Sequence, residues 1–153
     1  MTNEYLFAIK KRPNNMPQTI SRGIKALLDE ANAQIETLSA AQAIALVGND
    51  EVVIVDIRDP REIERDGRVP GSFACTRGML EFWIDPESPY AKPIFQQDKK
   101  FVLYCAGGLR SALAAKTAQD MGLTPVAHIE GGFAAWREAG GPVEAYVSKK
   151  PKG

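Results

Sequence analysis

The sequence contains few of the residues that build metal clusters or disulfide frameworks. Its 153 residues include two cysteines, Cys75 and Cys105, and one histidine, His128. Small secreted domains that rely on disulfides carry more cysteines, and a structural zinc site needs four Cys or His ligands. We therefore expect no disulfide framework, no metal site and no other cofactor.

An excess of charge of either sign is also missing. Lys plus Arg number 19 and Asp plus Glu number 19, so the formal net charge is zero and no overall field attracts nucleic acid or anionic lipid. No apolar run is long enough to cross a bilayer, and residues 1–5 lack the basic and apolar regions of a signal peptide. We expect a cytoplasmic protein that binds neither nucleic acid nor membranes.

What is present is the pattern of an α/β fold. With 44% hydrophobic and 25% charged residues, the chain suits a single domain with a buried core. Apolar runs predict strands, and helical spacing or helix-forming composition predicts helices between them. The predicted strands are 52–55, 73–75, 101–104 and 126–129, and the predicted helices are 20–33, 39–46, 60–65, 78–83, 111–121 and 133–139. This alternation predicts a mostly parallel sheet with helices on both faces.

Cys105 is the first candidate for chemistry. It follows the apolar run 101–104 and precedes the helix-forming segment 112–118. The N–H groups of such a loop and the dipole of the following helix favour an anion. They lower the pKa of a thiol toward the nucleophilic thiolate. The alternative is a buried cysteine that acts as a small apolar residue, but the glycines and Arg110 that follow favour a catalytic Cys105.

The segment after Cys105 has the composition of an anion-binding loop. Gly107 and Gly108 allow the chain to wrap closely, so that backbone N–H groups converge above the sulfur, and Arg110 adds a fixed positive charge. The predicted substrate-binding residues are Ala106, Gly107, Gly108, Leu109, Arg110 and Ser111. The loop is not a nucleotide P-loop, because the Gly-Lys-Ser/Thr ending is missing.

Four further segments form a specific combination: Val55–Glu62, Gly67–Ser72, Cys105–Arg110 and Glu130–Trp136. Together they resemble the rhodanese family of sulfurtransferases, and the stretch Arg77–Pro86 resembles that of a single-domain bacterial group. The resemblance implies a three-layer fold whose central sheet has about five mostly parallel strands. In the family's Gly-His-Ile-Pro-Gly-Ala pattern, Arg68 replaces the histidine and Ser72 replaces the alanine. We interpret both as structural positions.

The resemblance also implies a sulfur relay. Cys105 would take the outer sulfur of an anionic donor such as thiosulfate and pass it to cyanide or to a thiol, including one on a protein. In the family a six-residue loop suits sulfur, whereas related phosphatases carry one residue more; the segment Cys105–Arg110 is the short form. Two alternatives stay open: a non-catalytic or regulatory binding domain, and a phosphatase or arsenate-reductase-like enzyme.

The chain divides into three predicted parts. Residues 1–36 form an N-terminal arm and helix, residues 37–145 form the rhodanese-like domain, and residues 146–153 form a flexible tail. The N-terminal helix either covers the sheet or contacts a second copy, so a monomer and a homodimer both stay open.

Several further residues carry two interpretations each. Asp56 and Arg58 are an ion pair or supporting groups of the site, and Trp83 is a packing residue or an aromatic wall. Cys75 is a small residue in a short buried strand, or a resolving thiol that attacks the persulfide or sulfenate of Cys105. His128 is interpreted as a core histidine rather than a base. The pair Gly131-Gly132 is interpreted as a tight structural turn.

Overall fold

All five strands of the central sheet run parallel. The computed structural model describes residues 15–147 and orders the strands β1-β5-β4-β2-β3. Their bounds are β1 (Glu36–Leu38), β2 (Val52–Asp56), β3 (Phe73–Ala74), β4 (Lys100–Tyr104) and β5 (Val126–Ile129). The order confirms the predicted α/β class.

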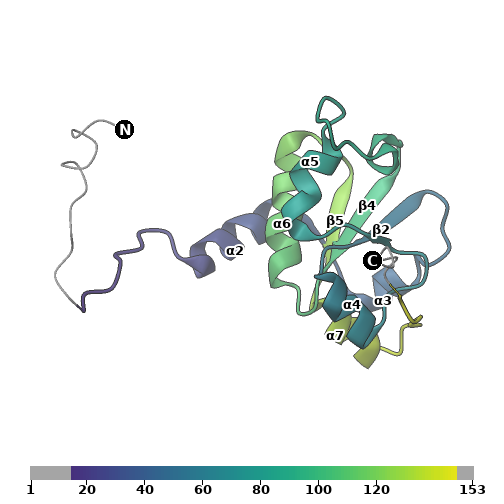
Figure 1. The fold of residues 1–153 in the computed structure, drawn as a ribbon. Coiled ribbons are helices and arrows are strands. Elements are labelled where there is room, and N and C mark those ends of the chain that lie inside the picture. Colours follow the sequence, from purple (N-terminus) through teal and green to yellow (C-terminus); the bar gives the residue numbers. More distant parts are fainter. Residues whose placement is uncertain (1–14, 148–153) are drawn as a thin grey trace, which may run out of the picture.

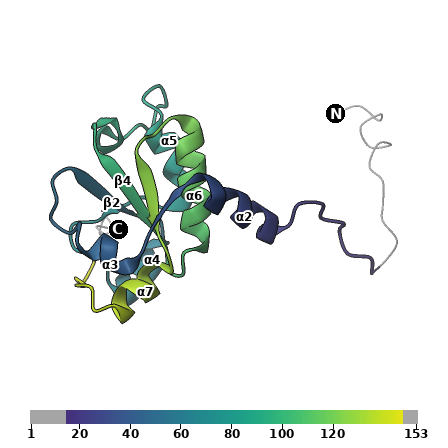
Figure 2. The ribbon, with the colours of Figure 1, turned by 180° about the vertical axis from the view of Figure 1, so that it is seen from behind.

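Helices cover both faces of this sheet (Figure 1 and Figure 2). Their bounds are α2 (Ile24–Gln34), α3 (Ala40–Ile44), α4 (Pro60–Asp66), α5 (Leu80–Ile84), α6 (Leu109–Met121) and α7 (Gly132–Glu138), with 3₁₀ segments η1 (Arg77–Met79) and η2 (Pro93–Gln96). One apolar cluster joins the sheet to α2, α5 and α6, and another joins it to α3 and α7. The fold therefore has three layers.

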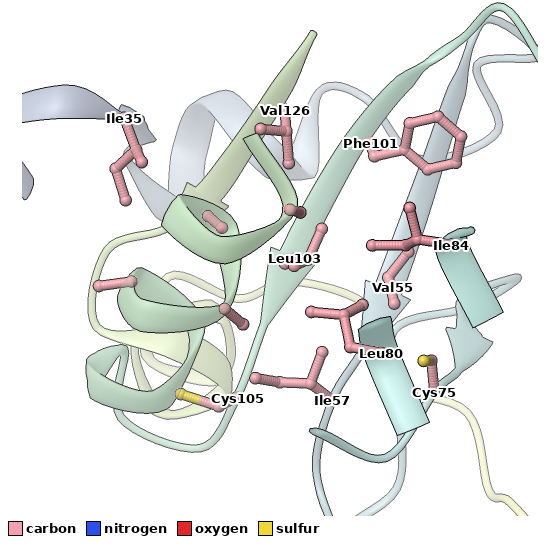
Figure 3. Packing of buried hydrophobic residues seen from close by; sticks show 14 of the residues in the cluster. Ile35, Val55, Ile57, Cys75, Leu80, Ile84, Phe101, Leu103, Cys105 and Val126 are labelled. Carbon is pink, nitrogen blue, oxygen red and sulfur yellow. The ribbon is translucent and has the colours of Figure 1, made fainter. Parts of the chain in front are cut away.

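Side chains of β4 alternate between the two apolar clusters. Phe101 and Leu103 lie in the cluster under α6, whereas Val102 and Tyr104 lie in the cluster under α7. Figure 3 shows the first cluster, with Cys105 at its end. Because all of these side chains are buried, β4 is a continuous apolar run rather than an alternating one, as expected for a central parallel strand.

Two helices begin at the capping boxes that the sequence contains. Ser39 accepts a hydrogen bond from the Gln42 N–H at 3.1 Å while the Gln42 side chain accepts one from the Ser39 N–H at 2.9 Å. Asp59 and Glu62 make the same reciprocal pair at the start of α4, with Pro60 in the first helical position. Pro60 therefore starts a helix, as predicted.

The predicted helix over residues 20–33 is wrong at its start. The helix begins at Ile24, after Gly23, and Ile20 is 68% exposed. Residues 20–23 have helical periodicity but no apolar surface to pack against, and periodicity alone does not stabilise a helical turn. Strand β1 was not predicted: three residues are too few for a recognisable pattern, and its register comes from pairing with β5.

Two predicted segments lie partly outside the described residues: the arm over residues 1–14 and the tail over residues 148–153. Near the end of the described chain, Arg68 joins Glu144 through two backbone hydrogen bonds of 2.9 Å and a 2.7 Å ion pair. The chain is therefore attached to the domain at Glu144. None of the helices within residues 15–147 is long and apolar enough to cross a membrane.

Candidate active site

Cys105 lies directly after β4, at the edge of the sheet where the parallel strands end. Its Sγ accepts hydrogen bonds from the N–H groups of Gly108 at 3.1 Å and Ser111 at 3.3 Å. Gly108 has φ +92°, a left-handed conformation that turns the loop back over the sulfur. Helix α6 begins at Leu109 rather than at the predicted Ser111, so Arg110 and Ser111 belong to its first turn.

The Ser111 side chain adds a third contact to the sulfur. Ser111 Oγ lies 3.5 Å from Cys105 Sγ and 3.0 Å from Nδ1 of His128. Ser111 is fully buried and His128 is 3% exposed. Two N–H donors and the Ser111 hydroxyl therefore meet at the sulfur, and a histidine of β5 lies behind the hydroxyl.

Burial and hydrogen bonding act in opposite directions on Cys105. Burial raises the pKa of the thiol, but hydrogen bonds from the Ser111 side chain and from the N–H groups of Ser111, Gly108 and Gly107 outweigh it. The pKa of Cys105 therefore lies below that of an ordinary thiol. A larger share of Cys105 is thiolate at neutral pH than an unperturbed thiol would have.

The start of α7 supports the Cys105 loop from behind. The N–H of Phe133 donates to the Cys105 carbonyl at 2.8 Å, and that of Ala134 donates to the Ala106 carbonyl at 3.0 Å. A Cβ on Gly132 would lie 2.5 Å from the Cys105 carbonyl oxygen, and its φ is +59°. The predicted tight turn at Gly131-Gly132 is thus also the surface on which the loop rests.

Arg110 is engaged by a residue that the sequence analysis did not assign to the site. Its guanidinium donates to both carboxylate oxygens of Glu62 at 3.0 and 2.9 Å. The hydrogen bond from Arg110 lowers the pKa of Glu62 to about 2, although burial opposes it. The positive charge of Arg110 is therefore partly neutralised by Glu62.

Asp56 and Arg58 form the ion pair given as their first interpretation. Arg58 donates to both Asp56 oxygens, at 3.0 and 2.7 Å, and Tyr104 donates to Asp56 at 2.6 Å. The Arg58 guanidinium also lies 4.4 Å from the centre of the Phe133 ring. This buried network joins β2, β4 and α7 beneath the Cys105 loop.

The ring contacts of Trp83 lie at the β3 edge of the sheet. Trp83 packs on Phe73, with ring centres 5.9 Å apart, and Lys92 lies 4.8 Å from the Trp83 ring centre. These contacts make Trp83 a packing residue, with the edge of the sheet as its surroundings.

Cys75 is separated from Cys105 by a whole strand. Ile57 lies between them (Figure 3), because the chain after β2 runs between those after β3 and β4. Two strand spacings put the Cα atoms roughly 10 Å apart, beyond the ~7 Å limit for a disulfide. Burial raises the pKa of Cys75 to about 12. The resolving thiol stays a prediction that this geometry does not support.

Both contacts that the sequence analysis missed depend on the order of strands. Glu62 reaches Arg110 because β2 and β4 are neighbours, which places α4 beside the start of α6. His128 reaches Ser111 because β5 pairs with β4. The only feature of the local sequence that singles out Glu62 is its place in the capping box of α4, which does not indicate a contact with Arg110. Among the described residues, no group of three His, Cys, Asp or Glu side chains is arranged to hold a metal ion.

Comparison with known proteins agrees with this geometry. Residues 39–139 match the family model described as a rhodanese-like domain. The thiosulfate sulfurtransferase GlpE of Pseudoalteromonas translucida is 32% identical over 102 residues, which are 67% of this chain and 89% of that protein. The chain belongs to the rhodanese-like domain family.

Two further similar proteins carry descriptions of different activities. A solved structure from Rhodopseudomonas palustris, described as a protein of unknown function and possible tyrosine phosphatase, is 82% identical; its TM-score is 0.83, and the match covers 85% of this chain and 100% of that one. A tRNA uridine(34) hydroxylase of Escherichia coli is 31% identical over 81% of this chain. The match spans only 36% of that hydroxylase.

Proposed function

We propose that this protein is a sulfurtransferase that carries sulfur as a persulfide on Cys105. The observation that carries the proposal is the convergence of the Gly108 and Ser111 N–H groups on the buried Cys105 sulfur. Such donors stabilise the negative charge of a Cys105 thiolate, and the same loop can stabilise the charge of a sulfur atom bound to it. The similarity to a thiosulfate sulfurtransferase supports the same activity.

The proposed reaction has two displacement steps. The Cys105 thiolate attacks the outer sulfur of thiosulfate; the sulfur–sulfur bond to sulfite breaks, sulfite leaves with the electron pair, and a persulfide forms. Cyanide or a thiolate then attacks the outer sulfur of the persulfide and restores the Cys105 thiolate. The donor's outer sulfur is transferred at its own oxidation level, so neither step needs a cofactor.

The substitution Cys105→Ser tests this proposal. We expect thiocyanate formation from thiosulfate and cyanide to disappear, because serine is not ionised at neutral pH. Intact-mass analysis after thiosulfate treatment should show one added sulfur atom on the wild type and none on the variant. Cys75→Ser is the matched control and should keep the adduct, since Cys75 is buried away from the loop. An adduct on Cys105→Ser, or a wild-type rate, would contradict the proposal.

A phosphatase activity is the second candidate, because the 82% identical structure is described as a possible tyrosine phosphatase. The six-residue segment Cys105–Arg110 disfavours it, because the related phosphatases carry a loop that is one residue longer. Turnover of a phosphotyrosine peptide that depends on Cys105, in the absence of the sulfur adduct, would replace our proposal by this one.

The remaining properties extend the proposal. The donor is a small sulfur-bearing anion and the acceptor is cyanide or a thiol, on a small molecule or on a protein. The protein works in the cytoplasm, where thiols stay reduced, as a monomer or a homodimer.

A further inference from the structure

A chain of hydrogen bonds leads from Cys105 into the interior. Sγ of Cys105 lies 3.5 Å from Oγ of Ser111, and the same oxygen lies 3.0 Å from Nδ1 of His128. Ser111 is completely buried and His128 is 3% exposed. Contacts of this length between buried polar groups are hydrogen bonds whose direction matters, because the hydroxyl has a single proton to donate.

The second nitrogen of His128 decides that direction. Nε2 is buried, and none of the described residues makes a hydrogen bond to it. Burial lowers the pKa of His128, although Glu130 opposes the shift, so the ring is neutral and carries one N–H. A buried N–H without an acceptor is costly. The ring proton is therefore better placed on Nδ1, where Oγ of Ser111 accepts it.

We propose that His128 is a positioning residue for Cys105. By donating from Nδ1 to Oγ of Ser111, His128 turns the Ser111 hydroxyl proton toward the sulfur and thereby stabilises the thiolate. With the opposite tautomer, the hydroxyl would donate to His128 and offer the sulfur only lone pairs. The inference rests on the proposed function insofar as the thiolate is the nucleophile of sulfur transfer.

The other charged groups near this chain are on the elements packed around it. Arg110 on α6 interacts electrostatically with Cys105, and Glu130 follows β5 close to His128. His128 also lines a hollow of about 540 Å³ beside the loop, together with Glu130, Gly107 and Gly108. A variant of His128 leaves both charges in place, so a change in the ionisation of Cys105 reports on the hydrogen-bond chain.

Titration of the Cys105 thiolate, followed by its ultraviolet absorbance and by its alkylation rate, tests the inference. We expect His128→Phe to move the midpoint upward by about one pH unit, a tenfold change in the ionisation constant. Cys75 does not interfere, because burial raises the pKa of its thiol to about 12. Val126→Ala, a packing change on the same strand, is the matched control and should leave the midpoint in place. An unchanged midpoint in His128→Phe, or an equal shift in Val126→Ala, would overturn the inference.

A double-mutant cycle separates positioning from general destabilisation. Ser111→Ala alone should raise the midpoint, and adding His128→Phe should change it no further, because His128 acts only through the Ser111 hydroxyl. Additive shifts would overturn the inference. If His128→Phe does not fold, His128→Asn and His128→Gln replace it: the asparagine places an amide near the former Nδ1, whereas the glutamine places it near Nε2.

For these two variants we expect different thiolate titrations. The midpoint should lie near that of the wild type in His128→Asn and above it in His128→Gln. Equal midpoints in the two variants would overturn the inference. The titration uses no sulfur donor. A raised midpoint in His128→Phe or His128→Gln together with a missing sulfur adduct in the wild type would therefore leave the positioning role intact and reject the sulfurtransferase function.

Discussion

At Cys105, burial and hydrogen bonding compete for the ionisation of one sulfur atom. The thiol is 1% exposed, which by itself favours the neutral form, and the hydrogen bonds of the loop outweigh that effect. The sequence predicted the donors from Gly107, Gly108 and the following helix. It did not predict His128 behind Ser111, because a lone histidine in an apolar strand has the pattern of any core residue.

Glu62 sets how strongly Arg110 attracts an anion. We expect Glu62→Gln to lower KM for thiosulfate about two- to fivefold with little change in kcat, because a partly exposed ion pair is worth up to about 1 kcal/mol. The glutamine still caps α4, so the helix stays in place. Steady-state kinetics with thiosulfate and cyanide measure the effect.

The control for that experiment is Glu138→Gln, which removes an exposed carboxylate at the end of α7. It changes the net charge equally and should leave KM unchanged. A KM that does not fall in Glu62→Gln, or that falls as much in the control, would show that Arg110 does not bind the donor.

At the scale of elements, the Glu62–Arg110 pair joins α4 to α6 and makes stability depend on pH. The hydrogen bond from Arg110 lowers the pKa of Glu62 from 4.5 to about 2. The stabilisation is therefore complete above the ordinary carboxylate pKa and is lost as the pH falls from 4.5 to about 2. Because Arg110 is nearly half exposed, we expect a loss below about 1 kcal/mol.

Urea unfolding at pH values above and within that window measures this loss. Glu62→Gln removes the titrating group, so its unfolding free energy should fall less steeply than that of the wild type over the same interval. Parallel curves for the two proteins would show that the pair does not contribute.

The contact between α7 and the Cys105 loop gives a sharper test. Gly132→Ala should lower both stability and sulfur transfer, because its Cβ would collide with the Cys105 carbonyl. Gly140→Ala is the matched control: its φ is +81° and nothing lies near its Cβ position. Both variants incur strain of about 1–2 kcal/mol from the left-handed backbone, but only Gly132→Ala should lose activity, by about tenfold or more.

A melting curve and an activity assay on each of these two variants make the comparison. Equal activity losses in Gly132→Ala and Gly140→Ala would show that the loop does not depend on the start of α7.

At the scale of the whole molecule, the last turns of α2 pack on the core, whereas Ile24 is 59% exposed and residues 15–23 before the helix lie outside the body of the fold (Figure 1). Ala31 and Ile35 are buried in the cluster under α6, and the Gln119 side chain donates to the Gln34 carbonyl at 2.8 Å. The predicted domain boundary at residues 36–37 therefore divides elements that pack together. That boundary stays a prediction until truncated chains are compared.

Two truncations decide how much of the N-terminal part the domain needs. Removing residues 1–22 keeps α2 and should change the melting temperature little. Removing residues 1–36 takes away α2 and the first residue of β1, uncovers α6, and should lower the unfolding free energy by more than about 3 kcal/mol, the value of burying one or two large aliphatic side chains. Equal melting temperatures for the two truncated chains would support the predicted boundary.

The sequence by itself determined the class of the fold, the strand that ends at Cys105 and the loop that follows it. These features are local: continuous apolar runs, two capping boxes, and glycines beside a cysteine. Only the tertiary structure decided that Glu62 holds Arg110, that His128 reaches Ser111, and that Ile57 separates Cys75 from Cys105. The physical reason is the order of the strands. Packing over the whole sheet decides which strands become neighbours, and this choice leaves no pattern in any single segment of the sequence.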